Sequence, residues 1–338
     1  MKIFSTFTQM NKQKFTTATM LCLLIIMVII AFIIAPNNLE GNNAFLSMTN
    51  LNNVIAQSAL LIISGFAVTL LLITGNLDLS IGSILAMAGV IYGVLARDGM
   101  LTGYAVLLAL VASMLMGALN AVLILGIKIN SAIVTLGTMS IARGLAKVLA
   151  DGSSIGAGLP RDFENIGATQ IVGIKLPNLI MIILVIIFTV IQNKTVFGKQ
   201  IIYLGSNKST AELSGIKTVK VMGILYIISG LLSGLCGIII ASRMRLADSG
   251  VGTEYAFDAI IAAVIGGTAL EGGAGSINGM VIGAFIIGII NNILNLLGVL
   301  PWWQFVAKGI VIILAILFQR NIYRIADKML NRVEKKLR

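Results

Sequence analysis

The sequence contains no histidine and only two cysteines, and charged residues make up only 11% of its 338 positions. Soluble domains carry about 25% charged residues, so this chain has too few to cover a surface that faces water. Hydrophobic residues make up 58% of the chain, and the mean hydropathy is +1.01. These values predict an all-α integral membrane protein, a bundle of helices whose solvent is lipid.

The missing histidine removes the commonest general base, proton shuttle and metal ligand. Cys22 and Cys236 lie far apart inside apolar runs and do not form a C-x-x-C motif. A disulfide framework, a zinc knuckle and a redox pair are therefore not expected, and both cysteines are interpreted as core or lipid-facing residues. We expect no catalytic residue, no metal site and no cofactor in this chain.

Long apolar runs follow one another along the chain, separated by short polar segments. A helix needs about 20 apolar residues to cross the hydrocarbon core of a bilayer. The pattern predicts about ten transmembrane helices, near 18–35, 53–74, 80–96, 103–126, 131–150, 177–193, 219–241, 255–270, 276–298 and 303–319. The segment near 255–270 is rich in glycine and alanine, and we expect it to be short, broken or re-entrant.

The positions of the basic residues predict the orientation of the bundle. If the N-terminus is cytoplasmic, sixteen of the 24 lysines and arginines fall in cytoplasmic segments and five fall outside. This asymmetry follows the positive-inside rule for an even number of spans with both termini cytoplasmic. It also explains the net charge of +11 without nucleic acid as a partner.

We therefore expect a single transmembrane domain over residues 1–338. Residues 1–17 would form a cytoplasmic N-terminus, residues 18–319 a helix bundle with a cytoplasmic loop at 194–218, and residues 320–338 a basic cytoplasmic tail. The first span ends in Ile34-Ala35-Pro36 without a small-x-small cleavage site, so it is interpreted as an uncleaved anchor rather than a signal peptide.

The first informative motif is Thr74–Gly82, between the second and third spans. Asp78 is an acid flanked by apolar residues at a membrane edge, Gly75 and Gly82 allow tight turns, and Ser80 could cap the following helix. One interpretation is a polar hinge or a lining element of a pore. The alternative is a helix cap with a solvated carboxylate.

The second motif lies in the cytoplasmic loop. Asn207 as N-cap and Gly215 as stop predict a short helix from Ser209 to Ser214. An exposed helix on this face could bind a motor subunit, or it could be an ordinary amphipathic connector.

Glycines dominate two further stretches, Gly252–Asp258 and Gly266–Ser276. In a membrane protein they indicate close backbone packing or an irregular segment that lines a cavity. Neither stretch contains the Gly-Lys-Ser/Thr of a phosphate-binding loop, so no ATP site is expected.

Polar side chains inside spans are candidates for function because they are costly in lipid. Arg143 and Lys147 share a helix face, as do Asn291 and Asn295. Uncharged hydrogen-bonding groups suit a neutral polyhydroxyl solute, and they equally suit hydrogen bonds between helices. The set comprises Asn120, Arg143, Lys147, Asn291, Asn292, Asn295 and Lys308.

Five ordered motifs resemble the ribose-type permeases of bacterial ABC sugar importers, in a match from about residue 50 to residue 318. They are Thr74–Gly82, Thr135–Thr138, Gly205–Ile216, Gly266–Gly275 and Asn291–Val299. The resemblance implies a multi-pass protein of the bacterial inner membrane, working as a homodimer or beside a related second permease. It also implies a cytoplasmic ATP-binding subunit and a periplasmic sugar-binding protein as partners, besides membrane lipid.

The resemblance further implies roles for individual residues. Coupling to the ATPase is assigned to Asn207, Lys208, Ser209, Thr210, Ala211, Glu212 and Gly215. The polar residues at span ends and within spans are, by their own chemistry, the candidates for the translocation path or gate: Asn76, Asp78, Asn120, Asp258, Asn291, Asn292 and Asn295.

The leading hypothesis is the permease subunit of an ABC importer for a monosaccharide, with ribose as the first guess, working by alternating access. One alternative is a stand-alone secondary sugar carrier or facilitator, which would need paired acids in mid-membrane, whereas Asp78, Asp258 and Glu271 lie near span ends. Another is a membrane-embedded enzyme acting on lipid-linked substrates, which usually calls for clustered acids, metal ligands or histidine.

Overall fold

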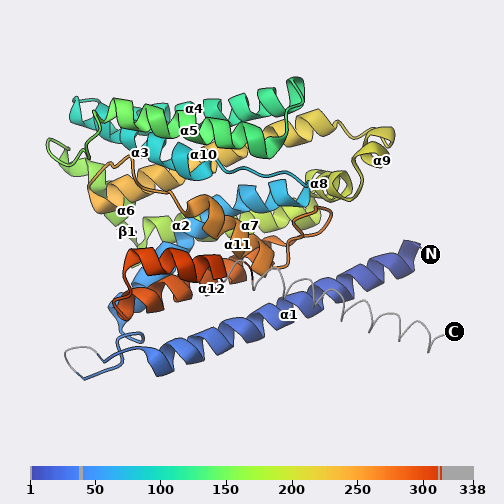
Figure 1. The fold of residues 1–338 in the computed structure, drawn as a ribbon, viewed down its shortest axis with the longest axis horizontal. Helices are drawn as coiled ribbons and strands as arrows, with labels where there is room; N and C mark the ends of the chain where they lie inside the picture. Colours follow the sequence, from blue (N-terminus) through green and yellow to red (C-terminus); the bar gives the residue numbers. More distant parts are fainter. Residues whose placement is uncertain (1, 38–40, 311–312, 314–338) are drawn as a thin grey trace. The chain divides into compact units, whose positions relative to one another are not determined.

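The structure is a computed structural model that describes residues 2–37, 41–310 and 313 (Figure 1). It contains two compact units, and each is described separately. Unit 1 comprises the described residues of 1–58, 261–268 and 275–338, and unit 2 comprises 59–260 and 269–274. The prediction of one domain over the whole chain stays a prediction.

Almost all regular structure is helical. The helices are α1 (Lys2–Ile34), α2 (Met48–Ile73), α3 (Ile81–Arg97), α4 (Thr102–Ala121) with its π-helical extension η1 (Val122–Gly126), α5 (Ser131–Leu149), the 3-10 turn η2 (Arg161–Glu164), α6 (Asn165–Ala168), α7 (Leu176–Lys194), α8 (Val196–Ser206), α9 (Lys208–Leu213), α10 (Thr218–Met244), α11 (Tyr255–Ile265) and α12 (Ile277–Leu296). A two-stranded antiparallel hairpin, β1 (Gln170–Ile171) and β2 (Ile174–Lys175), interrupts them.

Seven helical segments in the described part of the chain are long and apolar enough to cross a membrane. They begin and end within a few residues of the predicted spans, which confirms the all-α membrane fold class. α3 is a shorter apolar helix of 17 residues, and α11, with 11, is short as expected for the segment near 255–270. The count of ten spans and the cytoplasmic location of both termini stay predictions.

The last predicted span, near 303–319, is described only in part. Residues 301–310 are helical, and most of the remainder lies outside the described residues, together with the predicted basic tail at 320–338.

In unit 2, α10 packs against α3 and α4, and α5 covers α3 (Figure 1). Glycines set the distance between these helices. A Cβ atom on Gly237 of α10 would lie 1.9 Å from the Leu85 carbonyl oxygen, and one on Gly117 of α4 would lie 2.3 Å from that of Tyr226. Lipid provides no hydrophobic force to join helices, so backbones that approach this closely gain their stability from van der Waals packing.

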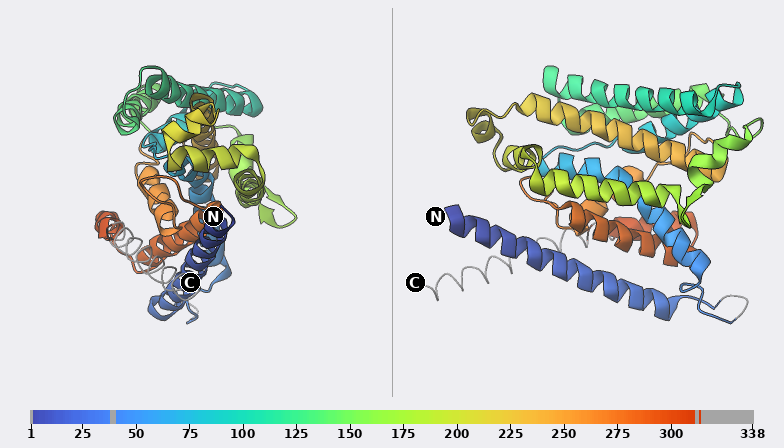
Figure 2. Two further views of the ribbon diagram at one scale, coloured as in Figure 1. Left: turned by 90° about the vertical axis from the view of Figure 1, so that its right-hand side faces the viewer. Right: turned by 180° about the vertical axis from the view of Figure 1, so that it is seen from behind.

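The segment after α5 is held in place by contacts with α3 and α10. Tyr92 stacks on Phe163 with ring centroids 4.3 Å apart and donates to its carbonyl oxygen at 2.9 Å. The Gly167 amide donates to Ser242 Oγ at 2.8 Å. These contacts bind η2 and α6 to one end of unit 2, where the hairpin also lies, and α8 and α9 lie at the opposite end (Figures 1 and 2).

In unit 1, α1 packs along α12. Ala31, Phe45, Val54 and Ile289 belong to its buried apolar cluster. Much of the remaining apolar surface of α1 is exposed, as lipid contact requires; Ile33, for example, is exposed.

Candidate functional site

The chain between α2 and α3, residues 74–80 (the 74–80 segment), has no regular secondary structure although much of it is buried in unit 2. A buried backbone amide or carbonyl group without a hydrogen-bond partner costs free energy. The non-helical backbone of this buried segment therefore needs donors and acceptors from elsewhere in the protein. Side chains from two helices supply them to Leu77: its amide donates to Ser131 Oγ and its carbonyl oxygen accepts from the Tyr226 hydroxyl, both at 3.4 Å.

Asp78 is only 1% exposed. Its Oδ1 accepts from the Ser80 amide at 3.0 Å and from Ser80 Oγ at 2.5 Å, and its Oδ2 accepts from Ser229 Oγ at 2.6 Å. The alternative of a solvated carboxylate is therefore wrong. The Ser80 side chain does not cap α3, as the sequence suggested it could, because its hydroxyl donates to Asp78 instead.

The hydrogen bonds continue through two more helices. Asn120 Nδ2 of α4 donates to Ser80 Oγ at 2.9 Å, and Thr138 Oγ1 of α5 donates to Asn120 Oδ1 at 2.6 Å. All five side chains are buried. This Asp78 network (Asp78, Ser80, Asn120, Thr138 and Ser229) joins the 74–80 segment to α4, α5 and α10. Hydrogen bonds in a low-dielectric interior are strong, so the network holds these elements in one arrangement.

The other residues predicted for the path lie in separate places. The amide of Asn76 donates to Thr74 within its own turn, and Asp258 is buried in the first turn of α11. In unit 1, Asn292 exchanges two hydrogen bonds with Asn50, at 3.0 and 2.7 Å.

The two remaining asparagines of α12 differ in their contacts. Asn295 Oδ1 accepts from Gln304 Nε2 at 2.9 Å. Asn291 Oδ1 is buried and has no hydrogen-bond partner among the described residues. The structure thus joins Asp78 to Asn120, and the path assignment of all seven residues stays a prediction.

Arg143 donates hydrogen bonds to backbone carbonyl oxygens. Its guanidinium donates to the carbonyl oxygens of Ser249, Val251 at 2.7 Å and Gly82 at 3.4 Å. Lys147, predicted to share its face, is exposed. Arg143 therefore binds the turn after α10 to the start of α3.

Two members of the Asp78 network, Thr138 and Ser229, were not identified as site residues from the sequence. Thr138 is the last residue of the Thr135–Thr138 motif, so the sequence did contain a signal for it. Ser229 had none, because α10 also carries Ser233 and Ser242 and only packing shows which serine faces Asp78.

At the end of unit 2 that carries α8 and α9, the structure confirms the predicted short helix, which is α9. Asn207 Oδ1 accepts from the Thr210 amide at 2.9 Å and caps α9, and Gly215, with φ +81°, follows its C-cap. Of the residues assigned to coupling, all except Ala211 are exposed. Glu212 accepts from Thr218 Oγ1 at 2.9 Å, which binds α9 to the start of α10.

A close backbone contact connects this end to the 74–80 segment. A Cβ on Gly205 of α8 would lie 1.7 Å from the Ile73 carbonyl oxygen and 2.8 Å from the Gly273 amide nitrogen. The same Ile73 oxygen accepts from the Gly273 amide at 2.8 Å, and Gly272 lies against Gly75. We call these five residues the glycine junction.

A cavity of about 850 Å³ lies beside the junction. Its walls include Asn76 of the 74–80 segment, Ser131 of α5, and Lys208 and Glu212 of α9. The segment thus begins at the glycine junction, passes a polar cavity bordered by α9, and ends in the Asp78 network.

Comparisons with known proteins found one family and several relatives that match most of this chain. A family described as branched-chain amino acid transport system / permease component matches residues 50–316. The ribose import permease protein RbsC of Bacillus subtilis is 39% identical over 88% of this chain and 91% of its own length. The L-arabinose transport system permease protein AraH of Escherichia coli is 33% identical, over 82% and 83%. The D-allose transport system permease protein AlsC of Escherichia coli is 34% identical, over 87% and 90%. No solved structure matches.

Proposed function

Because the chain belongs to the family of branched-chain amino acid transport system permease components, we propose that it is the permease of an ATP-driven importer of a monosaccharide, with ribose the first substrate to test. It is a multi-pass protein of the bacterial inner membrane and a transport component rather than an enzyme.

The similarity over nearly the whole chain carries this proposal. The family description refers to amino acids, but the relatives at 33–39% identity are named for ribose, L-arabinose and D-allose. All three are neutral polyhydroxyl compounds, which favours a sugar over an amino acid.

The exposed α9 and its flanking residues support a partner on the cytoplasmic side. In the proposal, a separate ATP-binding subunit contacts Asn207 to Thr210 and Glu212, and Leu213, 91% exposed, offers an apolar contact. The bundle has ten spans with both termini cytoplasmic. A sugar-binding protein delivers the solute on the other face, a second permease copy completes the path, and this chain itself needs no cofactor.

The glycine junction suggests how a movement of α9 could be transmitted to the 74–80 segment. A shift of α9 moves α8, whose Gly205 lies directly against the last turn of α2. The 74–80 segment begins there and is held at its other end by the Asp78 network. A packed junction cannot deform gradually, so ATP-driven movement would displace the segment as a unit relative to α4, α5 and α10. Asp78 and Asn120 would then act on the gate without touching the sugar.

The test is reconstitution of the chain with its ATP-binding subunit and sugar-binding protein in liposomes. Labelled ribose should enter only with ATP on the side of the ATPase, and labelled leucine should not. An ATPase variant that lacks the phosphate-binding lysine serves as control. Ribose uptake driven by an ion gradient without ATP would contradict the proposal and favour a secondary carrier.

A further inference from the structure

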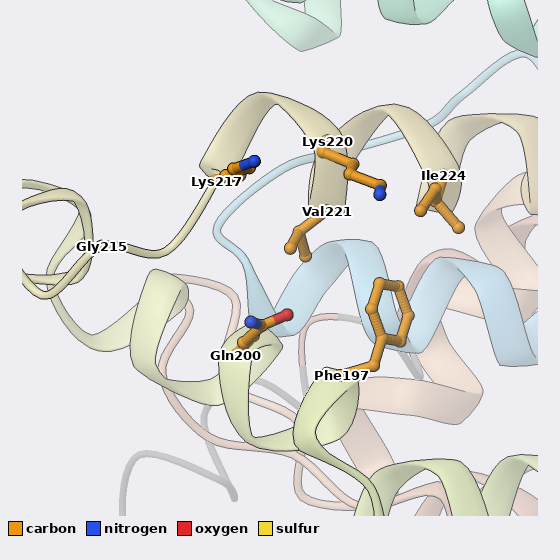
Figure 3. Close-up of a pocket in the computed structure, with 7 residues that line it drawn as sticks. All are labelled: Phe197, Gln200, Gly215, Lys217, Lys220, Val221 and Ile224. Atoms are coloured by element: carbon orange, nitrogen blue, oxygen red, sulfur yellow. The ribbon is translucent and has the colours of Figure 1, made fainter.

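A groove of about 380 Å³ lies between α8 and the first turns of α10, apart from the glycine junction and the Asp78 network. Figure 3 shows Phe197 and Gln200 of α8 facing Lys217, Lys220 and Val221 at the start of α10. Gly215 and Ile224 complete the lining. The groove therefore combines two cations with an apolar wall.

The region around the groove is strongly basic. The stretch 194–220 contains five lysines and a single acid, Glu212, and no acid lines the groove. The carboxylate of Glu212 accepts a hydrogen bond from Thr218. Both groove lysines are exposed, so their charges are available to an anion.

The groove lies at the level where a membrane span begins. α7 ends at Lys194 and α10 begins at Thr218, so both lysines are near the membrane surface. At 1.5 Å per residue, Val221 and Ile224 lie about 6 and 10 Å deeper than Lys217. The headgroup region is about 5–8 Å thick on each side of the hydrocarbon core. The lysines thus lie within the headgroup region, where the phosphate is, while Val221 lies near its inner boundary and Ile224 at the depth of the first acyl carbons.

We propose that this groove binds one anionic phospholipid, with its phosphate between Lys217 and Lys220 and the start of an acyl chain along Phe197, Val221 and Ile224. Basic pockets between membrane helices on the cytoplasmic side are suited to such headgroups. A soluble protein partner would have to reach the same apolar wall below the membrane surface, whereas α9 is already exposed above it. The bound lipid would join α8 to α10 at the end that carries α9.

The experiment uses the full chain in a neutral detergent, with phosphatidylglycerol or phosphatidylcholine of identical acyl chains as the probe. Native mass spectrometry counts the bound lipids. We expect tighter binding of phosphatidylglycerol, weakened about 10- to 30-fold by Lys217→Gln with Lys220→Gln, given the usual contribution of a lysine at an anionic surface. The matched control, Lys194→Gln with Lys199→Gln, removes the same charge outside the groove and should leave most binding intact.

A second variant keeps all lysines and fills the groove. Gln200→Trp should weaken phosphatidylglycerol binding without altering net charge, so the proposal stays testable if the lysine variant does not fold. If the groove variant and the control variant lost phosphatidylglycerol binding equally, the effect would reflect general electrostatic attraction, and the proposal would be overturned. It would also be overturned if phosphatidylcholine bound as tightly, or if the groove variants bound lipid normally but lost a co-purified ATP-binding subunit.

Discussion

At the scale of single residues, a carboxylate buried among helices costs free energy unless donors replace the water that it loses. Asp78 receives a backbone amide and two hydroxyls, and one of those hydroxyls is bound in turn by Asn120. The acid therefore organises an irregular segment that could not satisfy its own hydrogen bonds.

Asp78→Asn tests this function of the carboxylate. The amide would place an NH₂ donor where one carboxylate oxygen accepts, so a charge-assisted bond worth about 1.5–3 kcal/mol is lost. We expect the purified protein to aggregate at a temperature several degrees lower, measured by fluorescence-detected size-exclusion chromatography after heating. Asp98→Asn, at an exposed acid beside Arg97, should leave that temperature unchanged. A matching loss in both variants would show that burial of Asp78 is not the cause.

Gly205 tests the glycine junction in the same assay. Gly205→Ala would place a methyl group 1.7 Å from the Ile73 carbonyl oxygen, so α8 must move away from α2. Overpacking of this kind typically costs about 1–3 kcal/mol. Gly137→Ala in α5 is the control, because a Cβ there has no atom within 4 Å, and alanine in a helix is more favourable than glycine by about 0.5–1 kcal/mol. Equal thermal stability of Gly205→Ala and the wild type would disprove a tight junction.

At the scale of secondary-structure elements, α9 is only six residues long, too short to be stable by its own hydrogen bonds. Its stability depends on the Asn207 cap, the buried Ala211 and the Glu212–Thr218 hydrogen bond. Such an element can be weakened without unfolding the bundle.

Asn207→Ala removes the cap and should destabilise α9 by about 1 kcal/mol. If α9 couples the permease to its ATPase, ATP-dependent ribose uptake should fall several-fold while the yield of folded protein is unchanged. Asn207→Asp keeps an oxygen acceptor at the N-cap and should restore uptake. Unchanged uptake by Asn207→Ala would separate α9 from coupling, and failure of Asn207→Asp would show that the amide itself contacts the partner.

At the scale of the whole molecule, the two ends of unit 2 should face opposite sides of the membrane. The β1–β2 turn and α9 are separated by a single span, α7, and Val172 and Leu213 at these ends are 96% and 91% exposed.

Single cysteines at these two sites test the orientation, in a background with Cys22→Ala and Cys236→Ala. Val172→Cys should react with an impermeant maleimide in cells whose outer envelope admits the reagent but whose inner membrane is intact. Leu213→Cys should react only after that membrane is permeabilised. Labelling of Leu213→Cys in intact cells would invert the topology and contradict the positive-inside assignment.

Much of this protein could be predicted from the sequence because lipid leaves few choices. Every spanning segment must satisfy its backbone within a helix, so apolar runs of sufficient length predict α2, α7 and α12 directly. The cap at Asn207 and the stop at Gly215 are local, and α9 follows from them. The low content of charged residues predicted a membrane protein, and the five ordered motifs predicted its family.

The Asp78 network could not be read in this way. Asn120, Thr138 and Ser229 are each one polar residue in an apolar helix, and such a residue suits a solute contact as well as a bond to another helix. The rotational positions of these helices decide which side chains meet, and for α4 and α10 the close contacts at Gly117 and Gly237 restrict that rotation. Local sequence thus determined where the helices begin and end, whereas tertiary packing alone decided that Asp78 is buried, because burial depends on neighbours that are distant in the chain.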